Sequence, residues 1–302
     1  MSSVSAAPAA RLRRIALPAV AATAYSLNTV FARLALAGGA DVATINAARF
    51  LFIVVLLFGL SHGSRGAPSL SRKKRGSALL LGLPFSLTSL GYLASLRYIP
   101  VSIAVLVLYT YPILVGLLAG ASGGEGVSPR RLAALLLAFL GLALAMNVDI
   151  AALPDWRGVA LAFMAAAAMS VFVIGSARLL NGEARPEVNF HLMLGATVPV
   201  LALLPLGGGP HWPVAAAGWW SLASVLVTFS LAQLALLAAI GRAGAVLTAA
   251  VMNLEPVVTI ALAVLLVGER LSLSMSLGAA LVVLAIFLAD EPRKAAVLLA
   301  EP

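Results

Sequence analysis

The fold is decided by residues 100–144, which read PVSIAVLVLYTYPILVGLLAGASGGEGVSPRRLAALLLAFLGLAL, because residues 244–288 repeat the same pattern as GAVLTAAVMNLEPVVTIALAVLLVGERLSLSMSLGAALVVLAIFL. When residues 89–146 are set against residues 233–290 without a gap, 14 of the 58 pairs are identical. Many identities are Leu or Ala, but Pro112 matches Pro256, and Gly-Glu pairs match at 124–125 and 268–269. Each copy is typical of an apolar helix with a central proline, a Gly-Glu exit, a turn and a second apolar helix. The repeat predicts a protein of two related halves.

The composition indicates a protein that crosses a membrane several times. Hydrophobic residues make up 62% of the 302 and charged residues 10%, whereas soluble domains carry roughly 25% charged residues. The net charge of +9 comes from short basic clusters between apolar runs, without an aromatic-interleaved basic face, so nucleic-acid binding is not expected. The absence of cysteine excludes disulfides and thiolate chemistry.

Ten segments are apolar and long enough to cross a bilayer core of about 30 Å, which takes about 20 helical residues. They are residues 15–37, 42–61, 76–96, 100–120, 131–147, 157–180, 188–206, 215–240, 244–267 and 272–289. The first resembles a secretory signal after its three arginines, but its length and its Asn28 and Arg33 favour a retained span. Polar residues in 147–156 separate a first repeat, residues 15–147, from a second repeat, residues 157–289.

The number of spans fixes the relation between the halves. Each half has five spans, an odd number, so the second half is inverted relative to the first. With the N-terminus inside, 15 of the 20 basic residues fall on the inner side, 4 on the outer side and 1, Arg49, within the second span. The positive-inside rule then predicts that both termini are cytoplasmic. We therefore expect an all-α integral membrane protein of ten transmembrane helices in two inverted five-helix repeats.

Several short motifs resemble one family of membrane proteins. The phrase Leu254-Glu255-Pro256-Val257-Val258 followed by Gly268-Glu269-Arg270-Leu271, its first-repeat counterpart Tyr109-Thr110-Tyr111-Pro112 followed by Gly124-Glu125, and Ala48-Arg49-Phe50 are similar to the EamA repeat of the drug/metabolite transporter superfamily. Within it, the layout is most similar to the ten-helix, YddG-like exporters of aromatic amino acids. The resemblance implies a bacterial inner-membrane exporter with a central cavity lined by spans one, three, four, six, eight and nine, and with spans five and ten outside.

The candidate cavity residues are polar, aromatic or thioether side chains near the middle of these spans. They are Tyr25, Asn28, Thr88, Ser89, Tyr92, Tyr109, Tyr111, Met169, Gln233, Asn253 and Glu255. Pro112 and Pro256 are candidate kinks, because a proline removes one helical hydrogen bond and frees a carbonyl. Close helix packing explains many of these residues equally well.

Glu255 is the sharpest single candidate, because an ionisable group in mid-span costs about 2.5–3.5 kcal/mol and needs a partner or water. It could bind a substrate amine, carry a proton, or form a structural ion pair with Arg49. For Arg49 a helix contact or a headgroup position is favoured over a substrate carboxylate. The four tryptophans are typical of interfacial belts.

A secondary transporter of amino acids, with hydrophobic or aromatic ones favoured, is the leading functional interpretation. The alternatives are an exporter of drugs or other small metabolites and a membrane scaffold or sensor that transports nothing. The spans contain no nucleophile paired with a base, so an enzyme is not expected. The Gly-rich loop at 123–126 lacks the Lys and Ser of a phosphate-binding loop, so transport driven by ATP is not expected. The histidines form no metal-ligand spacing. We expect no cofactor, and a monomer in the lipid bilayer with a small-molecule substrate.

Overall fold

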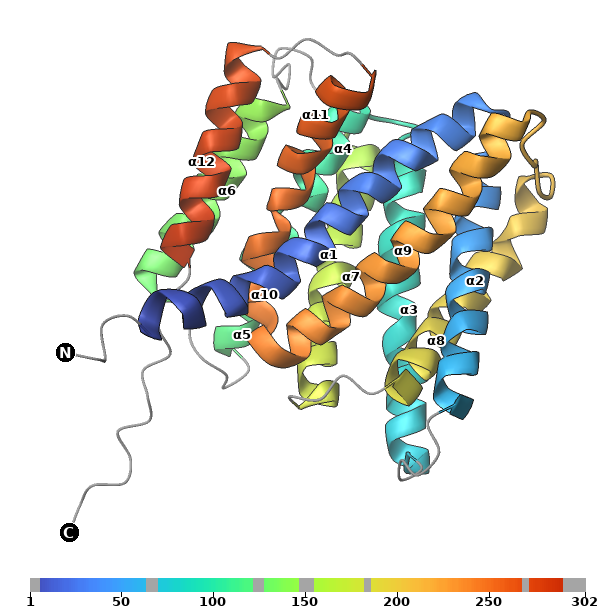
Figure 1. Cartoon of the computed structure of the whole chain (residues 1–302), viewed down its shortest axis with the longest axis horizontal. Coiled ribbons are helices and arrows are strands. Elements are labelled where there is room, and N and C mark those ends of the chain that lie inside the picture. Colours follow the sequence, from blue (N-terminus) through green and yellow to red (C-terminus); the bar gives the residue numbers. More distant parts are fainter. Residues whose placement is uncertain are drawn as a thin grey trace.

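The computed structural model of the chain describes residues 6–63, 70–121, 128–146, 155–181, 186–267 and 272–289, and this part of the chain is helical without strands (Figure 1). The Gly-Glu pairs and most of the predicted boundary between the repeats lie outside it. The helices are α1 Ala6–Ala37, α2 Val42–Gly63, α3 Arg72–Ser95, α4 Val101–Leu108, α5 Tyr111–Ala121, α6 Pro129–Ala145, α7 Trp156–Leu180, α8 Pro186–Leu203, α9 Ala216–Ala243, α10 Ala245–Met252, α11 Leu254–Val267 and α12 Leu273–Ala289, with a 3₁₀ turn η1 at Leu204–Gly207.

Each of the ten predicted spans is helical, and the fourth and ninth are each divided into two helices. Eight spans in the described part of the chain are long and apolar enough to cross a bilayer. The other two are α6 and α12, each an apolar helix of 17 residues. The predicted all-α membrane fold with ten spans is therefore confirmed.

The helix contacts follow the inverted repeat, which pairs each span with the span five places later. The contact of α1 with α9 has its counterpart in that of α7 with α3, and the contact of α3 with α8 has its counterpart in that of α9 with α2. The fifth spans of the two repeats, α6 and α12, pack against each other at one edge of the molecule, and α1 crosses the bundle beside α9 (Figure 1).

Glycines allow the closest of these helix contacts. A Cβ atom added to Gly278 on α12 would overlap the backbone of Gly141 and Ala145 on α6. A Cβ atom on Gly195 of α8 would overlap the backbone of Leu79 on α3 in the same way. Small residues let transmembrane helices approach closely enough for their backbones to touch, so these crossings depend on the missing side chains.

The two divided spans break just before the predicted kink prolines. Span four is interrupted at Tyr109 and Thr110, so Pro112 lies in the first turn of α5, and Pro256 likewise lies in the first turn of α11 after the break at Asn253. A proline in a first helical turn loses no hydrogen bond, because N–H groups there have no partner within the helix. The Thr110 hydroxyl donates to the Val107 carbonyl at 2.8 Å and closes the end of α4.

A set of hydrogen bonds closes the end of the bundle where α1 ends, which we call the distal end. Thr44 N donates to Asp41 Oδ1 at 2.7 Å, His211 N donates to Thr44 Oγ1 at 2.7 Å, and Asp41 N donates to the His211 carbonyl at 3.2 Å. Burial raises the pKa of the Asp41 carboxyl, but the hydrogen bonds with Thr44 and the His211 ring 3.3 Å away outweigh it and hold this pKa below its usual range. These contacts, the distal clasp, fasten the turn between α1 and α2 to the segment before α9.

Candidate functional site

A hydrogen bond between the two repeats joins α1 to α9 near mid-membrane. The Tyr25 hydroxyl donates to Gln233 Oε1 at 2.6 Å, and the Gln233 side chain has no exposed surface. Phe229 lies one turn before Gln233, on the same face of α9. Its ring meets the Tyr25 ring edge to face, with 6.2 Å between the centroids. Residues from both repeats therefore contribute to this contact between α1 and α9.

Arg49 extends from α2 into the same region. Its Nη1 donates to Asn28 Oδ1 at 3.3 Å, and its Nη2 donates to Ser89 Oγ at 3.5 Å. The guanidinium carbon lies 4.7 Å from the centre of the Phe229 ring, a cation–π distance. Arg49 Nε is buried and has no hydrogen-bond partner. The hydrogen bonds of the guanidinium thus go to neutral groups, and one of its three nitrogens, Nε, has no partner.

Two amides hold these partners in place. Asn28 Nδ2 donates to the Val225 carbonyl on α9 at 2.9 Å, which leaves its oxygen free to accept from Arg49. Ser89 Oγ donates to Asn46 Oδ1 at 3.2 Å, so its lone pairs can also accept from Arg49. The position of the guanidinium is therefore fixed from α1, α2, α3 and α9.

Glu255 brings the opposite charge to this site from the start of α11. Its carboxylate accepts a hydrogen bond from the Tyr109 hydroxyl, at the break in the other divided span, and it interacts electrostatically with Arg49 and Tyr25. The Glu255 carbonyl accepts from Ser26 Oγ of α1 at 2.7 Å. No ion-pair contact joins Glu255 to Arg49 in the described part of the chain. The two charged groups therefore lie in one region without forming a direct salt bridge.

We call this set of side chains the polar cluster. It comprises Tyr25, Asn28, Arg49, Ser89, Tyr109, Gln233 and Glu255. Two of its nitrogen atoms, Arg49 Nε and Gln233 Nε2, are buried without a partner. An unsatisfied buried donor costs about 1–3 kcal/mol. The cluster is therefore incomplete by itself and can accept an added oxygen acceptor.

The structure gives other expected site residues mainly structural contacts. The Thr88 hydroxyl donates to the Pro84 carbonyl at 3.0 Å and lies 3.3 Å from the Ala165 carbonyl on α7. Asn253 Nδ2 donates to the Ala250 carbonyl at 3.1 Å and closes the end of α10. These polar groups are committed to the backbone, so they offer little to a ligand.

The remaining expected residues lie beside the polar cluster. The Tyr111 ring is 6.0 Å from that of Tyr109, and its carbonyl accepts from Ser170 of α7 at 3.2 Å. Tyr92 and Met169 are half-buried and pack against apolar side chains. They contribute aromatic and thioether surface rather than hydrogen bonds.

Sequence reasoning missed Phe229, Asn46 and Ser26. Phe229 precedes Gln233 by four residues and Asn46 precedes Arg49 by three, so helical periodicity around the predicted polar residues would have found both. Ser26 follows Tyr25 directly and gave no pattern, because a serine in a transmembrane helix usually bonds to its own backbone. Its contact with Glu255 depends on the tertiary fold.

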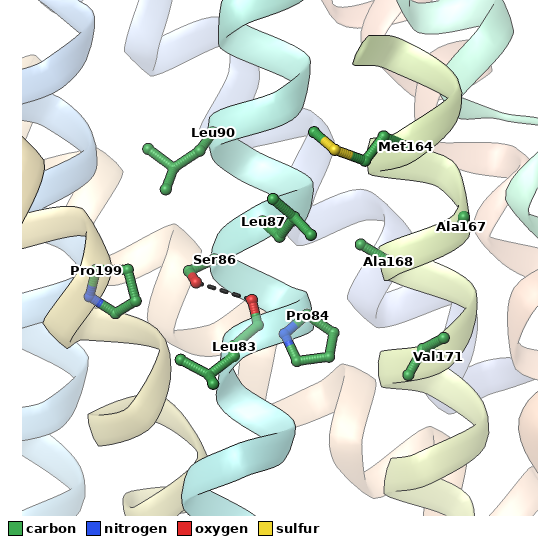
Figure 2. Close-up of a pocket in the computed structure, with 10 residues that line it drawn as sticks. All are labelled: Leu83, Pro84, Ser86, Leu87, Leu90, Met164, Ala167, Ala168, Val171 and Pro199. Atoms are coloured by element: carbon green, nitrogen blue, oxygen red, sulfur yellow. Dashed lines mark hydrogen bonds between the residues drawn. The ribbon is translucent and has the colours of Figure 1, made fainter. Parts of the chain in front are cut away.

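An apolar groove lies away from the polar cluster. It has a volume of about 520 Å³ and lies between α3, α7 and α8, with Pro84, Leu87, Met164 and Pro199 in its wall (Figure 2). The only hydroxyl there, on Ser86, donates to the Leu83 carbonyl at 2.9 Å. The groove is thus lined by apolar groups, so it cannot recognise a polar solute by hydrogen bonds.

These features define the class of protein. Two inverted repeats that share a charged site near mid-membrane are characteristic of transporters. Residues 13–147 and 156–289 each match the EamA-like transporter family, so the chain belongs to this family and is a membrane transporter of small molecules.

The chain also resembles a solved structure described only as "Crystal structure of protein". The TM-score is 0.77 at 19% identity, and the match covers 92% of this chain and 97% of the other. At that identity the likeness bears on the fold alone. No functionally curated protein matches the chain.

Proposed function

We propose that this transporter exports amino acids, and that it favours those with hydrophobic or aromatic side chains. The observation that carries the proposal is the presence of one cation, Arg49, and one anion, Glu255, in a single polar cluster built from both repeats. An amino acid carries both charges on its head group and can match them. Tyr25, Tyr92, Tyr109 and the neighbouring Met169 supply an apolar and aromatic wall for its side chain.

The proposed orientation places both termini in the cytoplasm of a bacterial cell and the distal end outside. This orientation is supported by the excess of basic residues on the side of the predicted spans opposite the distal end. Transport would proceed by alternating access, with the distal clasp closing the outer side in this conformation. A monomer suffices, because one chain supplies the whole polar cluster, and the export direction follows from the family resemblance.

The proposal is tested by uptake of labelled amino acids into proteoliposomes, with and without a pH gradient. We expect saturable flux of large hydrophobic amino acids above empty vesicles. We also expect that Glu255→Gln lowers this flux strongly, because it removes the charge opposite the substrate ammonium group. Glu187→Gln, at the start of α8, is the matched control, since it removes a carboxylate outside the polar cluster.

The outcomes separate the alternatives. Loss of only the pH-driven part of the flux in Glu255→Gln would make Glu255 a proton carrier, whereas unchanged flux would make it structural. Flux of hydrophobic drugs without amino acids would favour a drug exporter. Absence of flux for every solute would favour a scaffold or sensor.

A further inference from the structure

We propose that Arg49 Nε and Gln233 Nε2 form the subsite that binds the substrate carboxylate. The inference deepens the proposed function, because it assigns the acidic end of the amino acid to named atoms. It also changes the interpretation of Arg49, whose sequence context favoured a helix contact or a headgroup position. The assignment rests on unused donors, on charge and on the comparison of the two repeats.

The two donors are free for identifiable reasons. Tyr25 donates to Gln233 Oε1, which fixes the amide so that Nε2 points away from the Tyr25 hydroxyl. Asn28 and Ser89 occupy the two terminal nitrogens of Arg49 and leave Nε bare. Five buried side-chain atoms in the described part of the chain have no partner, and these two are the nitrogens among them.

Both residues also lie near Phe229, Arg49 through a ring contact and Gln233 through its place one turn later on α9. Arg49 lies over the Phe229 ring at 4.7 Å, Tyr25 meets its edge, and Gln233 follows one turn later on α9. In the proposed subsite the carboxylate lies beside this ring and accepts from the guanidinium and from the amide. Gln233 has no exposed surface, so its amide is out of contact with bulk water in this conformation.

The charge balance favours a carboxylate over other acceptors. The hydrogen-bond partners of Arg49 are neutral, and Glu255 is engaged by Tyr109 instead. Glu255 interacts electrostatically with Arg49 but makes no hydrogen bond to it, so a neutral ligand would leave the guanidinium without a charged hydrogen-bond partner. A carboxylate supplies that partner, and hydrogen bonds between charged groups are about twice as strong as neutral ones. The ammonium group of the same molecule then faces Glu255.

The repeat relation shows that only one copy carries this subsite. The position 144 residues after Arg49 is Met193, and the position 144 residues after Asn28 is Phe172, and both are fully buried. The second repeat therefore replaces the cation and its amide partner by apolar side chains. One carboxylate subsite per chain follows, and Met at the equivalent position makes Arg49→Met a suitable test substitution.

The experiment compares the transported amino acid with the amine obtained by removing its carboxylate, such as phenylalanine and phenethylamine. In wild-type proteoliposomes the amine should compete at least about 10-fold more weakly. Arg49→Met and Gln233→Leu should each raise the KM for the amino acid by about 10- to 100-fold, as expected for loss of a hydrogen bond to a charged group. The inhibition constant of the amine should stay unchanged.

Arg131→Met is the matched control. Arg131 is also a buried arginine, but its Nε donates to the Ala289 carbonyl at 3.2 Å, where α6 meets α12. Gln233→Glu is a second variant, which should reject the amino acid by charge repulsion and still accept the amine. If Arg49→Met does not fold, as shown by failure to elute as a single species in size-exclusion chromatography, Gln233→Glu tests the carboxylate subsite in its place.

Two results would overturn the subsite. One is an equal loss of affinity for the amino acid and the amine in the variants, and the other is a wild-type protein that does not distinguish the two. If the wild type transports no amino acid, the proposed function fails by itself. Calorimetric titration of the purified protein with 3-phenylpropionate then decides the inference. Binding that requires Arg49 supports the carboxylate subsite, and no binding refutes it.

Discussion

The bond between Tyr25 and Gln233 gives the most direct test of the site geometry. Tyr25→Phe keeps the ring and its contact with Phe229 but removes the hydroxyl that donates at 2.6 Å. The Gln233 amide, which has no exposed surface, then loses its partner. Such a loss costs about 1–3 kcal/mol. Hydrogen bonds between transmembrane helices couple by about 0.6 kcal/mol on average and about 1.7 kcal/mol at most, and we expect the upper value for this short, buried bond.

The coupling is measured by a double-mutant cycle with Tyr25→Phe, Gln233→Leu and the double variant, from reversible unfolding in mixed micelles with increasing SDS. Tyr98→Phe is the control, because the Tyr98 side chain is exposed at the distal end. We expect no change in the unfolding free energy for that variant. A coupling below about 0.3 kcal/mol is within ordinary additivity. It would refute the claim that Tyr25 orients the amide, and would remove one support of the carboxylate subsite.

Three further predictions concern the scaffold. Gly278→Ala should lower the thermal stability in detergent, because its Cβ would overlap the backbone of α6. The control Gly59→Ala has open space around the new Cβ and should be neutral or slightly stabilising. Equal melting temperatures of the two variants would contradict the close crossing of α6 and α12. Asp41 has a depressed pKa in the folded state, so the distal clasp is intact above about pH 4 and is lost as the pH falls through that pKa. Trp212 fluorescence should report this change in the wild type but not in Asp41→Asn. Thr88→Val should cost about 1 kcal/mol of stability without changing the substrate KM, and a raised KM would return Thr88 to the binding site.

Much of the fold could be predicted because the chain carries it twice. The spacing of 144 residues, the positions of Pro112 and Pro256, and the length of the apolar runs set the ten spans and their two breaks. These signals are local or repeated along the chain. The exact end of α4 could not be predicted, because a proline's effect extends over the preceding turn, and the helix ends at Leu108 rather than at Pro112 itself.

The site was harder to predict, because its contacts join distant parts of the sequence. Periodicity placed Tyr25, Gln233 and Glu255 near mid-membrane but gave no reason to pair Tyr25 with Gln233, 208 residues away. For Arg49 the sequence favoured a helix contact or a headgroup position, and the structure gives it hydrogen bonds to Asn28 and Ser89. The unused Nε could not be foreseen, since it depends on which of five donors the tertiary structure occupies.

The placement of the two charged residues has a consequence for how the chain enters the membrane during synthesis. The hydrogen-bond partners of Arg49 lie on α1 and α3, so they are complete once three helices have left the ribosome. Glu255 is made much later, when Tyr109 is already in the bilayer. We therefore expect the first repeat to insert with Arg49 already hydrogen-bonded. Glu255 of the second repeat then inserts into a bilayer that already contains Tyr109, its hydrogen-bond donor.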